Sequence, residues 1–446
     1  MAIRDKIRLI VFIHLVAIAL LLNIASAEQQ EKMDDLEGKM LTLAECIRIA
    51  VEIHPDIRSK MAEVNAGKAR TGQAFSSFLP ALDLSSGYSK SRFENQESSS
   101  VATSGSAENY TIGLYLSQNI FDFGRSLSRW KMTREEAAAI SYILNTTGQE
   151  VVFNVEETYC NHLKALRMEK VNREALASAE FHLKQASGFY EAGTRAKIDV
   201  VRAQVDLSNA RVELIKAKNM VRLSKVSLDN AMGLGEPAAY QIRDDLEFRE
   251  SNYDMDEMVA AACRNRPDLL SLDAGLKALD YEIDLRQSGR LPELSARFSY
   301  DWKGDSAPLD REWKAAITLD FPIFSGLDTS WKISEAHDKQ ESLKAQRESL
   351  KLQIRKEVEQ ALLSLKEARE RLSAAKTGAE QARENLRLAR GRYRAGLATI
   401  IDLSDARVLL LRADTSRIEA LYDYRIADAS IKKAAGIIPF RLNSEG

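Results

Sequence analysis

Histidine and cysteine, the side chains that most often serve as nucleophiles, bases or metal ligands, are few in this sequence and lie far apart. Beyond residue 27 they are His54, His162, His182 and His337, together with Cys46, Cys160 and Cys263. None of them shows the spacing of a metal site, and the chain contains no phosphate-binding loop or nucleophile elbow. We therefore expect no enzyme activity, no metal and no cofactor. The cysteines should be small buried apolar residues, and the histidines structural or solvated.

The overall composition also limits the possible partners. The chain has 63 basic and 65 acidic residues, a net charge of −2, which excludes the electrostatic surface that nucleic acid requires. Only 8 of the 446 residues are proline, and the abundance of alanine, leucine, glutamate, lysine and arginine indicates long helices.

The N-terminus has the features of a signal peptide over residues 1–27. Arg4 and Lys6 precede an apolar run over residues 9–22, which is followed by the small residues Ala25 and Ala27. A retained membrane anchor is the alternative, but the run is short for a spanning helix. No later segment has the ~18 consecutive apolar residues of a transmembrane helix, so any membrane crossing must use β-strands.

The remainder of the chain is a tandem repeat, over residues 28–234 and 235–446. His54-Pro55-Asp56 corresponds to Arg266-Pro267-Asp268 at an offset of 212 positions. Ile120-Phe121 and Gly193 correspond to Ile323-Phe324 and Gly396 at an offset of 203. The offset changes within a serine-rich loop over residues 94–108. A loop is where a repeated structural unit best tolerates a change of length.

Each repeat contains two segments in which apolar and polar residues alternate strictly, as in strands with one apolar face. We expect strands at about 81–90, 109–121, 292–302 and 312–323. Segments of roughly ten residues suit tilted strands that cross a bilayer, and aromatic residues near their ends suit its interfaces. A half-buried sheet in a soluble domain is the alternative, but Asp83, Arg297 and Asp301 on the polar face suit a wet lumen better. Four strands cannot close a barrel, so several copies must combine.

Very long helices follow each pair of strands, at about 125–192 and 197–233, and at about 327–395 and 399–435. Apolar residues recur at alternating spacings of three and four, as at Val358, Ala361 and Leu365, which predicts coiled-coil packing. A proline-free helix of this length would reach ~100 Å. The predicted fold is thus dominated by helices, with four transmembrane β-strands per chain, and the glycines at 193 and 396 end its helical hairpins.

Together, the signal peptide, the duplicated strand pairs, the long hairpins and the Tyr-x-x-Gly turns resemble the TolC-like outer membrane efflux protein family. The resemblance implies a homotrimer in the outer membrane, in contact with its lipid. A twelve-stranded barrel would continue into a helical barrel across the periplasm. It implies a passive exit duct of a tripartite efflux or type I secretion system, working with a periplasmic adaptor (membrane fusion) protein and an inner-membrane transporter.

The resemblance also implies a pore gate at the hairpin tips. Asp402 and Asp405 occupy the positions of the family's gate aspartates, six and nine residues after Gly396, and three copies would form two acidic rings that favour cations. Asp199 is the matching residue of the first repeat, and Tyr393 matches a tyrosine of the closed state. The alternative is that the aspartates only stabilise the start of a helix.

The same resemblance places the adaptor contact at the tip turns, on Gly193, Thr194, Gly396 and Leu397. One departure stands out: the family's gate arginine is replaced by Ala398, while Arg195 occupies the equivalent position of the first repeat. The rival function is a structural trimeric coiled coil or adhesin-like protein without a pore. Drugs, proteins and metals all remain open as cargo.

Overall fold

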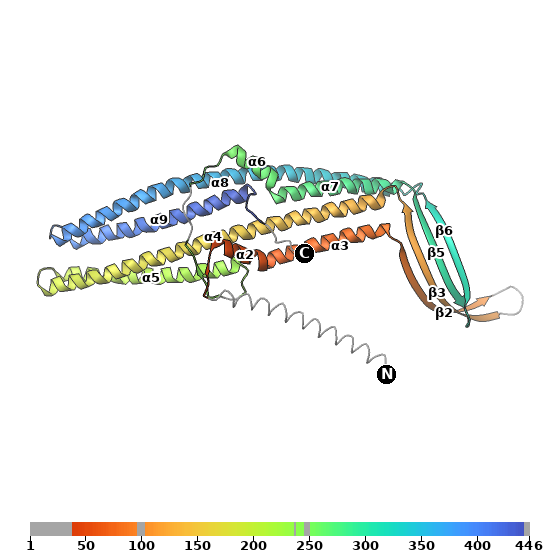
Figure 1. Ribbon diagram of the computed structural model, residues 1–446, viewed down its shortest axis with the longest axis horizontal. Coiled ribbons are helices and arrows are strands. Elements are labelled where there is room, and N and C mark those ends of the chain that lie inside the picture. Colours follow the sequence, from red (N-terminus) through yellow and green to blue (C-terminus); the bar gives the residue numbers. More distant parts are fainter. Residues whose placement is uncertain (1–37, 96–102, 236–237, 245–249, 441–446) are drawn as a thin grey trace, which may run out of the picture. The chain divides into compact units, whose positions relative to one another are not determined.

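The computed structural model describes residues 38–95, 103–235, 238–244 and 250–440, so the expected signal peptide at 1–27 lies outside the described residues. The chain divides into two compact units, which are described separately. Unit 1 comprises Met1–Arg58, Thr147–Asn265 and Ile354–Gly446, and unit 2 comprises Ser59–Thr146 and Arg266–Gln353. Several long helices contribute residues to both units (Figure 1).

The elements occur in the same order in both halves of the chain. The first half has helices α2 (Leu43–Ile53) and α3 (Pro55–Phe75), strands β2 (Ala81–Asn95) and β3 (Thr103–Phe121), and helices α4 (Arg125–Glu191) and α5 (Lys197–Ala231). The second has α6 (Met255–Asn265), α7 (Pro267–Gln287), β5 (Glu293–Gly304), β6 (Asp310–Asp320), α8 (Asp328–Arg394) and α9 (Ile400–Ala434). Equivalent helices have equal lengths, of 11, 21, 67 and 35 residues.

Two kinds of short element, 3-10 turns and two-residue strands, complete the described chain. The 3-10 turns η1 (Ser76–Phe78) and η2 (Ser288–Arg290) precede the strand pairs of the two halves. Strands β1 (Met40–Leu41) and β4 (Gln241–Ile242) form a separate parallel pair in unit 1. In the described part of the chain, no helix combines the length and the apolar character that a membrane span requires.

The first strand pair is longer than the alternation of residue types suggests. β2 extends to Asn95 and β3 begins at Thr103, so both reach into the serine-rich loop. The pairing continues without interruption from Tyr88↔Tyr110 to Asn95↔Thr103. Backbone hydrogen bonds extend an antiparallel ladder whatever the side chains are, which is why the side-chain pattern placed the end of β2 too early and the start of β3 too late.

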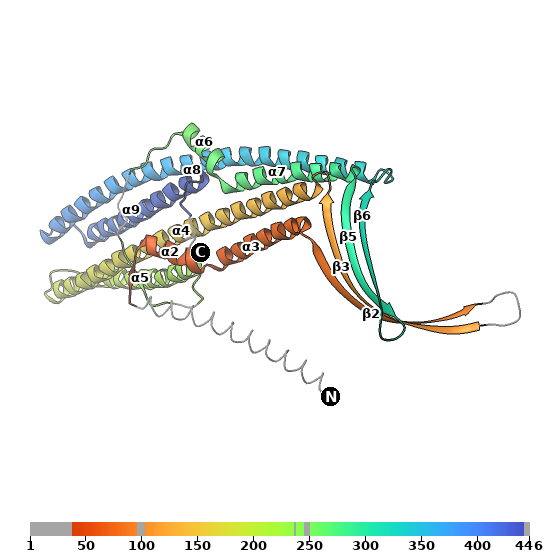
Figure 2. The same cartoon turned by 45° about the vertical axis from the view of Figure 1, so that its right-hand side comes forward.

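In unit 2 the four long strands form one antiparallel sheet in the order β2-β3-β5-β6 (Figure 2). The register aligns the apolar residues of all four strands on one face, for example Leu114 with Tyr300 and Tyr300 with Trp313. Much of this face is exposed: Leu84 is 70% accessible and Ile317 is 73% accessible. An extended apolar surface of this kind marks contact with lipid or with another protein.

The opposite face of the sheet is polar and contains one closely packed contact. The hydroxyl of Tyr115 donates to a carboxylate oxygen of Asp301 (2.7 Å), across the β3–β5 pairing. Gly113 makes room for this bond, because a Cβ on Gly113 would collide with the Tyr115 hydroxyl and with Asp301 Oδ1. Asp301 is only 7% exposed.

The heptad positions expected in the long helices form the core of the hairpins in unit 1. In α8 the residues Val358, Ala361 and Leu365 are all buried, as coiled-coil packing requires. One expectation fails: Cys46 and Cys160 are buried, but Cys263 is exposed. Cys263 lies on the short amphipathic helix α6, whose buried side carries Ala262.

Candidate gate at the tips of the helical hairpins

Both hairpins of unit 1 turn on a glycine with a left-handed backbone. Gly193 has a φ of 69° and Gly396 a φ of 75°. The amides of Thr194 and Leu397 donate to carbonyls five residues earlier, at 2.9 and 2.8 Å, which closes the helix ends in the Schellman manner. A Cβ on either glycine would meet no atom within 4 Å. The backbone angle, rather than the space available, therefore requires glycine at both turns.

The helices that leave the two turns begin differently. At the start of α9 the Thr399 hydroxyl accepts from the Asp402 amide (3.2 Å), and the Asp402 carboxylate accepts from the Thr399 amide (2.7 Å). This reciprocal pair is a capping box. The first half has Ala196 at the corresponding position, with no side-chain cap, so Asp199 has no such partner at its N-cap.

The two aspartates expected at the gate are exposed on the first turns of α9. Leu403 and Ala406, next to them in the sequence, are buried, so Asp402 and Asp405 lie on the side of α9 that faces away from the core of the hairpin. The Thr399 amide and hydroxyl donate to Asp402 and lower the pKa of its carboxyl below the usual value. Asp402 therefore remains charged at neutral pH while also stabilising the start of its helix.

Tyr393, the aromatic residue expected at the gate, is buried where the two hairpin tips meet. It is 5% exposed and belongs to an apolar cluster with Leu386, Ile400, Leu403 and Ala406. The guanidinium of Arg195, from the other hairpin, lies over its ring at 5.0 Å from the centroid. Burial raises the pKa of Tyr393, which Arg195 opposes and Asp199 reinforces.

The structure thus brings Asp199 and Tyr393 into one group of residues, with Arg195 between the hairpins. Asp199 is 9% exposed. A second bond joins the hairpins nearby, where the Ser404 hydroxyl donates to Asp206 (2.8 Å). Neither Arg195 nor the Ser404–Asp206 pair was assigned a role from the sequence, because both contacts depend on how the hairpins pack together.

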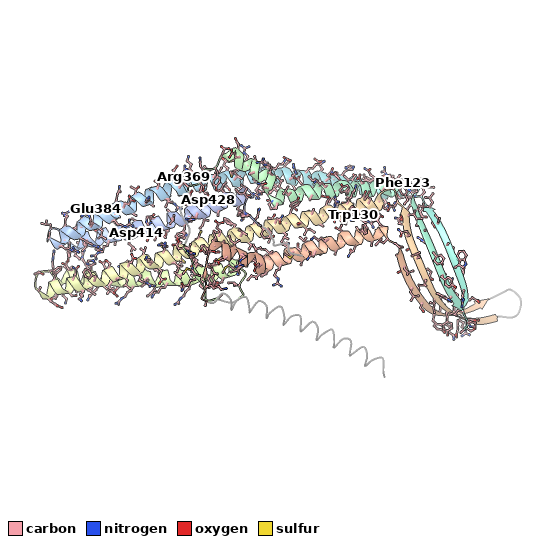
Figure 3. All side chains as sticks on the ribbon, viewed as in Figure 1. Phe123, Trp130, Arg369, Glu384, Asp414 and Asp428 are labelled. Carbon is pink, nitrogen blue, oxygen red and sulfur yellow. The ribbon has the colours of Figure 1, made fainter. Side chains whose placement is uncertain are left out.

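Two further ion-pair groups connect the hairpin helices away from the tip. Lys164 of α4 and Arg371 of α8 both pair with Asp423 of α9, at 3.3 and 2.8 Å. Arg383 of α8 pairs with Asp414 of α9 at 2.5 Å, in the region labelled in Figure 3. These contacts lie on partly exposed surfaces, where such ion pairs contribute little each.

Basic residues gather near the tip. Arg407 of α9 has two buried nitrogens, Nε and Nη2, without a hydrogen-bond partner among the described residues. Burial and the neighbouring Arg390 lower the pKa of Arg407 to about 10. Burial and the same two arginines lower the pKa of His182 to about 4. His182 is therefore a buried, neutral residue at neutral pH, as expected for a structural histidine.

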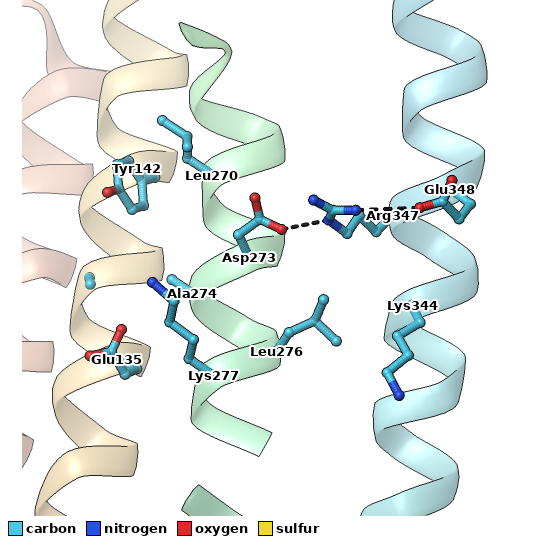
Figure 4. Close-up of a pocket in the computed structure, with 11 residues that line it drawn as sticks. Glu135, Tyr142, Leu270, Asp273, Ala274, Leu276, Lys277, Lys344, Arg347 and Glu348 are labelled. Atoms are coloured by element: carbon cyan, nitrogen blue, oxygen red, sulfur yellow. Dashed lines mark hydrogen bonds and ion pairs between the residues drawn. The ribbon is translucent and has the colours of Figure 1, made fainter. Parts of the chain in front are cut away.

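Unit 2 contains a cleft between α4, α7 and α8, with a volume of about 710 Å³ (Figure 4). Arg347 crosses it to Asp273 (2.5 Å) and also pairs with Glu348 (3.4 Å). Arg347, Asp273 and Glu348 of the charged lining are therefore paired with one another. Across the described residues, no group of histidine, cysteine and carboxylate side chains could hold a metal ion.

Known proteins with this arrangement are membrane channels. The family of outer membrane efflux proteins matches residues 46–234 and 258–437. The outer membrane protein TolC of Escherichia coli is 22% identical and covers 86% of this chain and 80% of its own. The alkaline protease secretion protein AprF of Pseudomonas aeruginosa is 24% identical and covers 89% of this chain and 85% of its own.

Solved structures agree on the fold. The CmeC outer membrane channel of Campylobacter jejuni has a TM-score of 0.77 at 20% identity, over 88% of this chain and 85% of that one. The outer membrane protein VceC of Vibrio cholerae has a TM-score of 0.74 at 18% identity, over 88% and 96%. TolC-like channels act in tripartite or type I systems together with adaptors and pumps. The chain belongs to the outer membrane efflux protein family, and is an outer-membrane exit duct that extends into the periplasm rather than an enzyme.

Proposed function

We propose that the chain is exported with a cleaved leader and works as a homotrimer, with a periplasmic adaptor and an inner-membrane transporter. The proposal of a trimer is supported by the open sheet of unit 2. Its outer strands, β2 and β6, each pair on one side only, and unpaired strand edges favour pairing with another chain. Three sheets of four strands would close a barrel of twelve, wide enough for a channel.

The gate of this duct would be the hairpin tips. Asp402 and Asp405 are exposed on successive turns of α9, so three copies would place two rings of carboxylates around the pore axis. Rings of this kind attract cations and repel anions. The role of Asp402 in the capping box does not compete with this function, because its hydrogen bonds to Thr399 favour the charged form.

The contact between Arg195 and Tyr393 would hold the gate closed. It joins the two hairpins of one chain near Asp199, and Ser404 and Asp206 form a second link beside it. Arg195 would thus replace an arginine at position 398, where this chain has alanine. The hairpins must separate for the tip to open, and both contacts would then be lost.

The turns beyond these contacts would receive the adaptor. Gly193, Thr194, Gly396 and Leu397 are exposed, and Leu397 is 71% accessible although it is apolar. An exposed apolar side chain at a loop tip suits a contact with another protein. The two left-handed glycines fix the direction in which each turn presents it.

Planar-bilayer recordings of the refolded protein test the pore and the gate together. We expect discrete conductance steps with a preference for cations, measured from the reversal potential in a salt gradient. Asp402→Asn with Asp405→Asn should reduce that preference, and Asp338→Asn, an exposed aspartate of α8 in unit 2, serves as the control.

Two results would count against the proposal. A refolded, assembled protein without conductance would support the rival function of a structural coiled coil. Conductance with unchanged selectivity in the double variant would leave the channel in place but remove the aspartates from the gate.

A further inference from the structure

A cluster of exposed apolar residues lies where β6 passes into α8, all within unit 2. Ile323 is 89% exposed, Phe324 80%, Leu327 57% and Trp331 70%. Leu327 and Trp331 are four residues apart, and the Trp331 amide donates to the Leu327 carbonyl (3.1 Å), so they lie one turn apart on the same side of the chain. Side chains this large and apolar are seldom exposed together without a partner.

The other half of the chain provides a comparison at the equivalent positions. Ile120 and Phe121 match Ile323 and Phe324, but Gly124 and Ser128 occupy the places of Leu327 and Trp331. In the first half the exposed apolar residues at this junction include Phe123 and Leu127, which are only 46% and 42% exposed, so the apolar surface at the start of the long helix is more exposed in the second half.

The backbone conformation at Leu327 indicates that a large apolar side chain is required at this position. Its φ is 66°, close to the 86° of its counterpart Gly124. A bulky residue in the left-handed region is an outlier that costs free energy, which glycine would avoid. Strain of this kind is retained where a side chain is needed for another reason.

The apolar surface ends abruptly one turn beyond Trp331. The groove that begins at Trp331 continues along α8 past Ser334, Glu335, Asp338, Lys339 and Ser342. Glu335 and Lys339 form an ion pair at 2.7 Å. A seam with a neighbouring protein chain would be expected to continue its apolar pattern along the helix. A change from apolar to charged residues within one turn is typical of a membrane surface.

We propose that Ile323, Phe324, Leu327 and Trp331 insert into the periplasmic leaflet of the outer membrane and anchor the start of α8 in lipid. The cluster continues the exposed apolar face of the sheet past the end of β6, through Leu319 and Phe321, which are 64% and 58% exposed. Tryptophan favours the depth at which acyl chains meet headgroups. Arg290, which donates to Ser330 (3.2 Å), supplies a cation for lipid phosphates, whereas Lys332, half exposed beside Trp331, is paired with Asp328 (2.6 Å).

Fluorescence quenching by brominated lipids tests this inference. The chain has four tryptophans, so Trp130→Phe, Trp302→Phe and Trp313→Phe leave Trp331 as the only emitter. The assembled protein is placed in vesicles of phosphatidylethanolamine and phosphatidylglycerol. We expect bromines near the headgroup end of the acyl chain to quench Trp331 more than bromines at the bilayer centre, because interfacial residues lie ~5–10 Å deep. Aqueous iodide should quench it little.

A matched control moves the indole along the same groove. In the same background, Trp331→Phe with Ser342→Trp should give emission that iodide quenches and brominated lipid does not. If iodide alone quenches Trp331, the residue is in water and the inference is wrong. If neither agent quenches it, a neighbouring protein chain covers it, and the inference is equally wrong.

Should the triple variant fail to assemble, the comparison is made between the natural chain and Trp331→Phe. The difference in lipid quenching then reports Trp331 alone, and no difference overturns the inference. The quenching results do not depend on the proposed gate. Trp331 lies near the start of α8, whereas the gate residues tested by ion selectivity follow the end of that helix.

Discussion

The guanidinium of Arg195 lies 5.0 Å above the ring of Tyr393, although the two residues come from different repeats of the chain. A cation over an aromatic face is attracted by the ring's quadrupole, and the attraction grows where water is excluded. Tyr393 is 5% exposed, so this contact is shielded on the ring side. It gives the two hairpins of one chain a specific connection at their tips.

Removing that cation should make the tip easier to open. We expect Arg195→Ala to lose about 1 kcal/mol in each copy, and to raise the mean conductance and the frequency of open events in planar bilayers. Tyr393→Leu should behave in the same way, whereas Tyr393→Phe keeps the ring and should leave conductance nearly unchanged. Equal conductance in Arg195→Ala and the natural chain would show that the contact does not restrain the gate.

After the tip turns, α9 begins with a capping box and α5 does not, and single substitutions can remove the box from one repeat and add it to the other. Thr399→Ala removes the capping box and should weaken the first turn of α9 by about 1 kcal/mol. Ala196→Thr should produce a capping box in the first repeat, because Asp199 already stands three residues later, and should strengthen α5 by a similar amount. Hydrogen exchange of the amides in each first turn measures both effects. Faster exchange in both variants would contradict the assignment.

Much of this architecture could be predicted because it depends on local patterns. The left-handed turns follow from glycines at 193 and 396, and the buried positions of α8 follow from its three–four spacing. The capping box was also readable, since threonine followed three residues later by a carboxylate is its signature. Thr399 and Asp402 fit that pattern, so the stabilising role of Asp402 at the helix start includes hydrogen bonds as well as its charge.

The contacts between repeats could not be predicted in this way. Arg195 reaches Tyr393 only because the two hairpins pack at a particular rotation, which no spacing within either helix defines. The bond between Tyr115 and Asp301 likewise depends on the register of β3 against β5. Strand alternation identifies the face of each residue but not its neighbour across the ladder.

His182 should make the tip less stable in acid. Its pKa is about 4 in the folded chain, below the ordinary value of 6.5, because of burial and the nearby Arg407 and Arg390. Between these values the unfolded chain binds the proton and the folded chain does not, so stability is complete above pH 6.5 and falls as the pH decreases toward 4. The loss from pH 7 to pH 5 should be about 2 kcal/mol.

The measurement is the thermal midpoint at pH 7 and pH 5. His182→Gln should reduce the difference between the two midpoints, because the glutamine does not titrate. His337→Gln, at an exposed position of α8, should leave it unchanged. His162 has a similarly lowered pKa, of about 4, so part of the pH dependence should persist in His182→Gln. A full pH dependence in that variant would exclude His182 as a cause.

Gly113 should be replaceable only when its neighbour is also changed. A methyl group there collides with the Tyr115 hydroxyl and with Asp301, so Gly113→Ala should destabilise the sheet by about 1–3 kcal/mol and lower the yield of assembled protein. Tyr115→Ala removes the ring that lies over Gly113. In that background Gly113→Ala should cost less, because the Tyr115 ring is gone and the Asp301 carboxylate, no longer held by the Tyr115 hydroxyl, is free to rotate away. The thermal midpoints of the two single variants and the double variant form a cycle that measures the coupling. Additive effects would mean that Gly113 serves the backbone of β3 rather than the bond between Tyr115 and Asp301.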